Sequence, residues 1–180
     1  SLAAAIEDSP FFLPDGDIVF RAIEGDANFL YRMKANGADR HKISPRPAID
    51  AFAISPDGRW FVAAAPGPGP EHAAEVAAIA VDGSTSVTLC VTYCSLTWDT
   101  SGKFVYISFA LMKQGSYLLP VAPDTGLPKL PRTGIAVNDD LKNATTAPEI
   151  PHVVDSAVSP TVYAYTVQST RRNIYRIPLQ

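Results

Sequence analysis

The chain has 180 residues, of which 47% are hydrophobic and 18% charged, so it is long and apolar enough to fold as one domain or a small repeat array. Its formal net charge of −3, from 15 basic and 18 acidic residues, provides none of the positive surface that nucleic-acid binding needs. The longest apolar stretches, such as residues 76–81, are far shorter than the roughly 18 residues of a membrane span. We therefore expect a folded chain with no nucleic-acid partner and no membrane span.

Proline and glycine divide the chain into short segments, because 16 Pro and 11 Gly leave little room for long helices. Residues 11–20 read FFLPDGDIVF, two apolar runs around a Pro-Asp-Gly turn, which predicts a β-hairpin. The phrase returns at 52–62 and, degraded, at 96–106, so that its glycines lie 42 and 44 residues apart. A fourth copy at 157–165 keeps Ser-Pro but has lost Asp-Gly.

A second phrase follows the first in each unit. Residues 29–33 alternate as a half-buried strand does and run into a turn at Asn36-Gly37. Counterparts occur at 77–81, 117–121 and 173–177. A period in the low forties with four strands per repeat is typical of a β-propeller blade.

These phrases predict an all-β fold of about four antiparallel four-stranded blades, forming one propeller segment over residues 1–180. The approximate blade boundaries are 9–46, 47–90, 91–131 and 152–180, with an insertion at 132–151.

The repeated residues also carry a family resemblance. SPDGR at 55–59, followed by AVDG at 80–83, resembles the repeat of TolB-like β-propellers, relatives of the WD40-like (Trp-Asp) repeat proteins. The C-terminal stretch 172–179 is similar to the final strand of propeller segments that follow protein-kinase or winged-helix domains in bacterial regulators. This resemblance implies a sensory or scaffold role. No kinase signature occurs in the chain, so the resemblance implies no kinase activity.

The number of units raises the question of completeness. TolB-like propellers close with six or more blades, and four is the bottom of the known range. Because exposed edge strands are a liability, we expect a portion of a larger propeller whose missing blades come from another chain or copy. A closed four-bladed propeller is the alternative. Ser1 follows neither an initiating Met nor a basic segment, so we interpret it as the start of a cut domain or processed product.

No catalytic constellation is recognisable. The chain has no nucleophile elbow, His-Glu-x-x-His motif, phosphate-binding glycine loop or Cys-x-x-Cys pair. Its three histidines, His41, His72 and His152, fall in separate predicted loops. We therefore expect neither enzyme activity, nor a cofactor, nor a metal site.

Cys90 and Cys94 stand where one unit should end and the next begin. In a straight strand, residues four apart are too distant for a disulfide, so a bridge requires a bend at this place. A disulfide in an extracytoplasmic protein and two buried free thiols are both compatible with the sequence. The cysteine pair slightly favours an extracytoplasmic (periplasmic-side) location. Nothing else in the sequence indicates where the protein is located.

The innermost strands of a propeller line its channel, so polar residues at their beginnings are binding candidates. Asp50 and Asp155 both stand a few residues before a Ser-Pro turn, so the two carboxylates are expected to meet at the channel mouth and hold a cation or a cationic group. The alternative is that both are solvated turn formers.

Two irregular segments supply further candidates. Glu71 and His72 follow a Pro- and Gly-rich stretch at 65–70, which predicts a long loop over the channel mouth or an inert connection. In the insertion at 132–151, Asn138 or Asp139 is expected to cap a short surface helix. Long loops of this kind either bind partners or serve only in packing.

The favoured function is a non-catalytic sensor or interaction domain that recognises a protein or small-molecule ligand with loops at one face, within a larger regulatory protein. One alternative is a structural fragment that completes a propeller and self-associates through its edge blades. The other is an accessory domain that gates a separate hydrolase.

Overall fold

The computed structural model describes residues 7–69, 72–109, 115–144, 149–159 and 162–165. Its strands form sheets in which each strand pairs with its neighbours in the sequence. The first sheet contains β1 (Glu7–Phe12), β2 (Ile18–Glu24), β3 (Ala27–Met33) and β4 (His41–Lys42). The second contains β5 (Asp50–Ile54), β6 (Trp60–Gly69), β7 (His72–Ala80) and β8 (Ser86–Cys90). The third contains β9 (Ser95–Trp98), β10 (Phe104–Ser108), β11 (Ser116–Pro120) and β12 (Glu149–Ile150).

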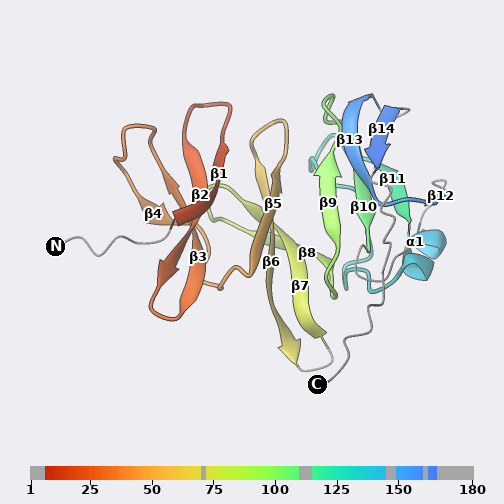
Figure 1. Cartoon of the computed structure of the whole chain (residues 1–180), viewed down its shortest axis with the longest axis horizontal. Helices are drawn as coiled ribbons and strands as arrows, with labels where there is room; N and C mark the ends of the chain where they lie inside the picture. Colours follow the sequence, from red (N-terminus) through yellow and green to blue (C-terminus); the bar gives the residue numbers. More distant parts are fainter. Residues whose placement is uncertain (1–6, 70–71, 110–114, 145–148, 160–161, 166–180) are drawn as a thin grey trace, which may run out of the picture.

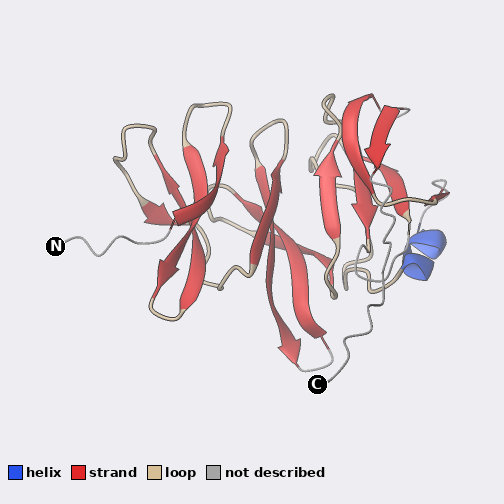
Figure 2. Cartoon of the chain, in the orientation of Figure 1, coloured by secondary structure: helices blue, strands red, loops and turns tan. Residues whose placement is uncertain are grey.

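Two strands, β13 (Val154–Ser159) and β14 (Val162–Tyr165), form the last described sheet. Figure 1 shows the sheets side by side in a row, with β5–β8 between β1–β4 and β9–β12. Figure 2 shows how little of the described chain is helical. The predicted all-β fold and its antiparallel four-stranded sheets are confirmed, and the open row fits a partial propeller rather than a closed four-bladed one.

In the first three sheets, the turns that link the first two strands are closed by their own polar side chains. The Ser55 amide donates to the Trp60 carbonyl at 2.9 Å, and the Ser55 hydroxyl accepts from the Trp60 amide at 2.9 Å. The Ser55 hydroxyl also donates to the Asp57 carboxylate at 2.6 Å. In the third sheet Asp comes first and Ser second in the turn, the reverse of the order in the second sheet. There the Ser101 hydroxyl donates to the Asp99 carboxylate at 2.6 Å.

The same turns make close contacts between neighbouring sheets. A Cβ added to Gly58 would lie 2.6 Å from Pro14 Cδ, and one added to Gly102 would lie 3.4 Å from Pro56. Both glycines also have positive φ angles, 71° and 69°. We call this contact, between the turn glycine of one sheet and the turn proline of the preceding sheet, the Pro–Gly seam. The repeated phrase therefore encodes sheet packing as well as turn geometry.

The core lies between the sheets, and β6 contributes to it on both of its faces. Because side chains alternate along a strand, Phe61 packs toward the first sheet, where its ring meets Phe11 edge-on at 5.2 Å between centroids. Val62 packs the other way, against Leu96 and Ile107 of the third sheet. All five of these residues except Phe11 are fully buried. The second sheet is thus sandwiched, as a propeller blade is.

The segment 132–151, which we predicted to be an insertion between two units, contributes a strand to the third sheet. Residues 121–148 separate β11 from β12, so the third sheet takes its last strand from within the predicted insertion at 132–151. The expected short helix is present as α1 (Asn138–Ala144). The Asp140 carboxylate accepts hydrogen bonds from the Ala136 and Val137 amides at 2.8 and 3.2 Å, which closes the turn before the helix.

This segment also covers an edge strand of another sheet. The Val91 amide donates to the Ile135 carbonyl at 2.9 Å, and the Ile135 amide donates to the Leu89 carbonyl at 3.0 Å. These bonds lie along β8, the outer strand of the second sheet. The insertion therefore protects an edge that would otherwise be open to pairing.

The prediction of a long loop around residues 65–72 is wrong. Residues 65–69 belong to β6 and His72 begins β7, so the segment is the end of a long hairpin that projects beyond the other strands in Figure 1. Pro66 is tolerated there because β5 begins opposite Ala64, which leaves β6 with only one neighbour beyond that point. Within the described residues, no helix has the length and apolarity needed to cross a membrane.

Candidate functional site

The sheets have two unlike ends. At one, which we call the turn end, lie the repeated turns of the Pro–Gly seam. At the other, which we call the entry end, the first strand of each sheet begins and the linkers between sheets arrive. The sequence-predicted Asp50 lies at the entry end, as the first residue of β5.

The Asp50 carboxylate binds a phenol from the next linker. The Tyr93 hydroxyl donates to Asp50 Oδ2 at 2.9 Å, and the Tyr93 ring meets Phe52 edge-on at 5.5 Å between centroids. Burial, followed by the hydrogen bond to Asp50, raises the pKa of Tyr93 to about 12. The phenol therefore stays protonated and serves Asp50 as a fixed hydrogen-bond donor.

An ion pair from the first sheet lies next to this bond. Arg21 donates from Nε and Nη2 to the two carboxylate oxygens of Asp8, both at 2.7 Å, in the bidentate geometry that orients a guanidinium firmly. Its third nitrogen, Nη1, donates to the carbonyl of Ile49, the residue before Asp50. The hydrogen bond from Arg21 lowers the pKa of Asp8, and Asp8, more than Asp50, raises the pKa of Arg21.

The backbone at β1 is adapted to this pairing. Ser9 has a positive φ of 52°, and the register between β1 and β2 shifts between Asp8 and Phe11. Such a bulge redirects a side chain in an otherwise regular strand. Here it accompanies an Asp8 that faces Arg21 on β2.

A disulfide holds the linker that carries Tyr93. Cys90 and Cys94 are bonded, with 6.3 Å between their Cα atoms, and both are fully buried. The bend that a bridge requires is present, since β8 ends at Cys90 and β9 begins at Ser95. Tyr93 thus lies inside a closed five-residue loop, which limits how far its hydroxyl can move from Asp50.

The base of the projecting hairpin is anchored to the linker before β5. Arg46 donates from Nη1 to the carboxylate of Glu75 and from Nη2 to the carbonyl of Pro66, the latter at 3.1 Å. Glu75 is buried, so this pairing fixes the hairpin where it leaves the sheet. The hairpin extends past Asp50 at the entry end.

The backbone places two of the other predicted residues, Asp155 and His72, on strands other than β5. Asp155 lies on β13, paired through its backbone with Ala164, and β9 lies between β5 and β13 (Figure 1). Asp50 accepts its hydrogen bond from Tyr93, and the side chain of Asp155 lies outside the described part of the chain, so the meeting of the two carboxylates stays a prediction. His72 pairs through its backbone with Gly69 at the hairpin end, and Glu71 lies outside the described residues.

Sequence reasoning missed Asp8, Arg21 and Tyr93. Asp8 stands six residues before the turn proline Pro14, as Asp50 stands six before Pro56, so alignment of the repeats would have singled it out. Tyr93 stands inside the cysteine pair that the sequence had already marked. Nothing in the sequence indicates Arg21, because it reaches Asp8 across a strand pairing whose register is irregular.

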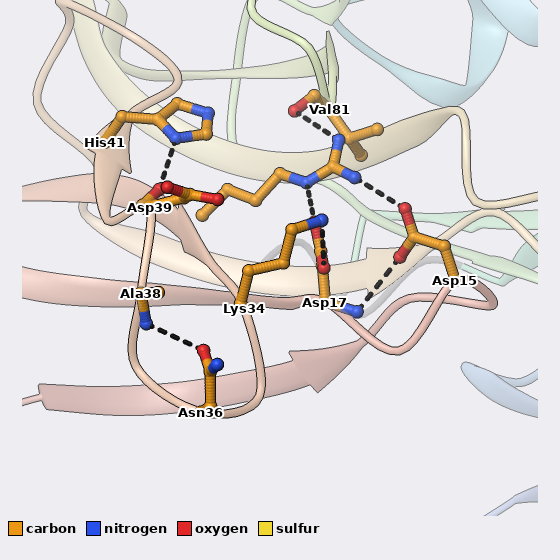
Figure 3. A network of polar contacts seen from close by, with 9 residues as sticks. Asp15, Asp17, Lys34, Asn36, Ala38, Asp39, His41 and Val81 are labelled. Atoms are coloured by element: carbon orange, nitrogen blue, oxygen red, sulfur yellow. Dashed lines mark hydrogen bonds and ion pairs between the residues drawn. The ribbon is translucent and has the colours of Figure 1, made fainter.

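Polar groups at the turn end form a second network, shown in Figure 3. Asp17 accepts from Arg32 Nε at 2.9 Å and lies 3.0 Å from Lys34 Nζ, while Arg32 Nη2 donates to Asp15 at 2.6 Å. The hydrogen bond from Lys34, with a smaller one from Arg32, lowers the pKa of Asp17. Arg32 also reaches the Val81 carbonyl of the second sheet at 3.5 Å. This network holds the first two sheets together.

Two open cavities also lie at the turn end. One of about 300 Å³ lies between the turns of the second and third sheets, and one of about 360 Å³ is lined by a single stretch, residues 119–124, with Lys129. In the first, the Asp57 and Ser101 side chains are already bonded within their own turns. We therefore assign this first cavity to sheet packing.

The entry end gathers charged and hydrogen-bonding side chains from three segments of the chain. Among the described residues, no group of three or more His, Cys, Asp or Glu side chains is placed to hold a metal ion. Carboxylates, a guanidinium and a protonated phenol, each held by a neighbour, form a polar surface of fixed geometry. Such a surface can recognise charged or hydrogen-bonding groups of a ligand.

The chain matches no family model and no curated protein sequence. Among solved structures it is similar to TolB from Acinetobacter baumannii, with a TM-score of 0.49 and 18% sequence identity. That similarity covers 68% of this chain and 33% of the TolB chain. The chain thus spans about a third of the TolB structure that it matches.

Proposed function

We propose that the chain is a non-catalytic binding domain that recognises a protein or small-molecule ligand at its entry end. One observation carries the proposal. Arg21 from the first sheet, Asp50 from the second and Tyr93 from the linker to the third converge there, each oriented by hydrogen bonds. These groups come from three segments and meet at the entry end, where the connections differ between units. The turn end, by contrast, carries the same turn in each unit.

The chemistry of the site favours a ligand with a cationic or hydrogen-bond-donating group. Asp8 and Asp50 contribute two carboxylates against the single guanidinium of Arg21. The projecting hairpin and the disulfide-closed linker flank them, so a partner approaching this end would meet three non-repeated elements at once. Loops held on a rigid scaffold are where binding residues concentrate.

Location and context are part of the same proposal. The Cys90–Cys94 disulfide supports an extracytoplasmic location, because disulfides persist in oxidising compartments. The resemblance to propeller segments of bacterial regulators supports a sensor domain within a larger regulatory protein.

Partner capture with matched variants tests the proposal. The immobilised chain is incubated with an extract of the cells that encode it, and the bound proteins and metabolites are quantified by mass spectrometry. The double variant Asp50→Asn with Tyr93→Phe alters the entry end without changing side-chain size greatly. Asp124→Asn, an exposed position at the turn end, is the control.

We expect one or more ligands to be retained by the wild type and by Asp124→Asn and lost from the double variant. Capture of nothing above the blank resin, or equal capture by all three proteins, would show that the entry end is not a binding face. Circular dichroism of each variant confirms that the fold is kept.

A further inference from the structure

The first two sheets carry an aspartate at the same place and give it different partners. Asp8 and Asp50 each stand six residues before the proline of the turn that follows. Across the strand pairing, Asp8 lies opposite Arg21 on β2, whereas Asp50 lies opposite Ala64 on β6. The second sheet therefore keeps the carboxylate of the first sheet and lacks the guanidinium that neutralises it there.

Arg21 itself does not serve Asp50. Its Nε and Nη2 donate to the two carboxylate oxygens of Asp8, and its Nη1 donates to the carbonyl of Ile49. Within the residues that the structure describes, no lysine or arginine forms an ion pair with Asp50. Asp50 therefore keeps a negative charge that a cationic ligand can neutralise.

The hydrogen bonds that Asp50 accepts leave two acceptor positions on its carboxylate. Oδ1 accepts from the Ala51 amide at 2.8 Å, and Oδ2 accepts from the Tyr93 hydroxyl at 2.9 Å. Because each carboxylate oxygen has two lone pairs, each keeps one for a further donor. Two such positions match the two parallel N–H groups of a guanidinium, which is the geometry that Arg21 adopts on Asp8.

Exposed aliphatic side chains lie beside this carboxylate. Ile49, the residue before Asp50, is 46% exposed, and Ile23 on β2 is 41% exposed. The backbone brings the two together, since Ile23 pairs with Asn28, whose carbonyl accepts a hydrogen bond from the amide of Ala48. A charge next to two apolar side chains suits an amphipathic partner better than a small inorganic cation.

We propose that the ligand of the entry end is a peptide segment in which an arginine stands next to an aliphatic residue. The arginine donates two parallel hydrogen bonds to Asp50, and its aliphatic neighbour packs on Ile49 and Ile23. Lysine fits less well, because an ammonium lacks the planar fork of a guanidinium. This inference rests on the proposed function, since it names the class of ligand for the same site.

Peptide pools of defined composition test the ligand. Binding to the full chain is measured by fluorescence anisotropy with labelled heptapeptides of the pattern x-x-Leu-Arg-Leu-x-x, in which x is any residue. Matched pools carry lysine or citrulline at the centre, or serine in place of both leucines. Citrulline keeps the shape of arginine and removes its charge, so it is the control for the ion pair.

We expect the arginine pool to bind about tenfold or more tightly than the citrulline pool, because a charged hydrogen-bonded pair is lost. The lysine pool should lie between them, and the serine pool should bind more weakly than the leucine pool. Equal binding of the arginine and citrulline pools would overturn the proposal.

Asp50→Asn tests the site itself, because it removes the charge and keeps the size of the side chain. We expect the arginine pool to bind this variant no better than the citrulline pool does. Asp124→Asn makes the same change of charge at an exposed position of the turn end and should keep the preference for arginine. A preference that survives in Asp50→Asn would overturn the assignment of the guanidinium to Asp50. Circular dichroism confirms the fold of both variants.

Ile49→Ser separates the apolar contact from the charge. The carbonyl that accepts from Arg21 belongs to the backbone, so the substitution keeps that hydrogen bond. We expect the preference for leucine over serine neighbours to shrink while the preference for arginine remains. Val87→Ser, which is 41% exposed on β8, is the control and should change neither. An unchanged preference for leucine in Ile49→Ser would overturn the apolar part of the proposal.

The capture experiment described above keeps this inference apart from the proposed function. If capture depends on Asp50 and Tyr93 while no pool shows a preference for arginine, the guanidinium ligand is wrong and the binding face stands. If capture is equal for all variants and the pools show no preference, both are wrong. Arginine preference in the pools, lost in Asp50→Asn, together with variant-dependent capture supports both.

Discussion

The hydroxyl of Tyr93 and the carboxylate of Asp50 lie 2.9 Å apart although 43 residues separate them in the sequence. The bond joins the linker after the second sheet to the first strand of that sheet. It therefore fixes both the position of the linker and the direction of the Asp50 carboxylate.

Tyr93→Phe should lower the free energy of unfolding at neutral pH by about 1–2 kcal/mol, because a partly buried hydrogen bond to a carboxylate is lost. Urea denaturation measures this change. The pKa of Tyr93 is raised to about 12 in the folded protein, against about 10 when unfolded. Its contribution is thus complete below pH 10 and is lost as the pH rises toward 12. Tyr163→Phe, on exposed β14, is the control and should change little.

No free thiol should be found when the chain is unfolded in denaturant without reductant, because Cys90 and Cys94 are bonded. Reduction, or the Cys94→Ala change, should lower the free energy of unfolding by about 2 kcal/mol, the value expected from loop-closure entropy for so short a loop. Two reacting thiols in the untreated protein would disprove the bridge.

Gly58→Ala should destabilise the chain more than Gly25→Ala does. Both substitutions strain a backbone with positive φ, at 71° and 64°, but only at Gly58 would the new Cβ lie 2.6 Å from Pro14. The difference in unfolding free energy should be about 1–3 kcal/mol, the usual cost of overpacking. If Pro14→Ala is added, part of that difference should be recovered, and additive effects would argue against the contact.

Asp17→Asn should flatten the acid side of the stability profile. The pKa of Asp17 is lowered by Lys34 and Arg32, so its contribution to stability is present above the unfolded pKa of about 4 and is lost as the pH falls through the lower folded value. Thermal unfolding midpoints recorded from neutral pH into the acid range measure this. Asp26→Asn, in an exposed turn, should leave the profile unchanged.

The strands and turns could be predicted from sequence because their signals are local. Pro-Asp-Gly turns and period-2 apolar runs identify β1, β2 and their repeats without any knowledge of distant contacts. The β6–β7 hairpin was missed because Pro66 and Pro68 normally end strands, and their tolerance depends on where β5 begins.

The candidate site was predicted only in part for a similar reason. Asp50 stands at the start of a strand, a position that the sequence reveals. The sequence does not reveal its partner Tyr93, because the hydrogen bond from Tyr93 to Asp50 depends on the bend between Cys90 and Cys94. The pairing of Ile135 with β8 likewise joins segments with no shared pattern.

The Pro–Gly seam has a consequence for how such a chain can be lengthened or shortened. Each turn proline contacts a turn glycine about one repeat farther along the chain. A duplicated or deleted segment therefore keeps these contacts only if every glycine still follows a sheet that carries its turn proline. The Pro14–Gly58 and Pro56–Gly102 contacts overlap in the sequence, so any single cut between residues 14 and 102 separates at least one of the two pairs. Engineered arrays and natural recombinants of this chain should therefore keep the seam only where each joined sheet brings a turn glycine to the turn proline of the sheet before it, wherever the breakpoint falls.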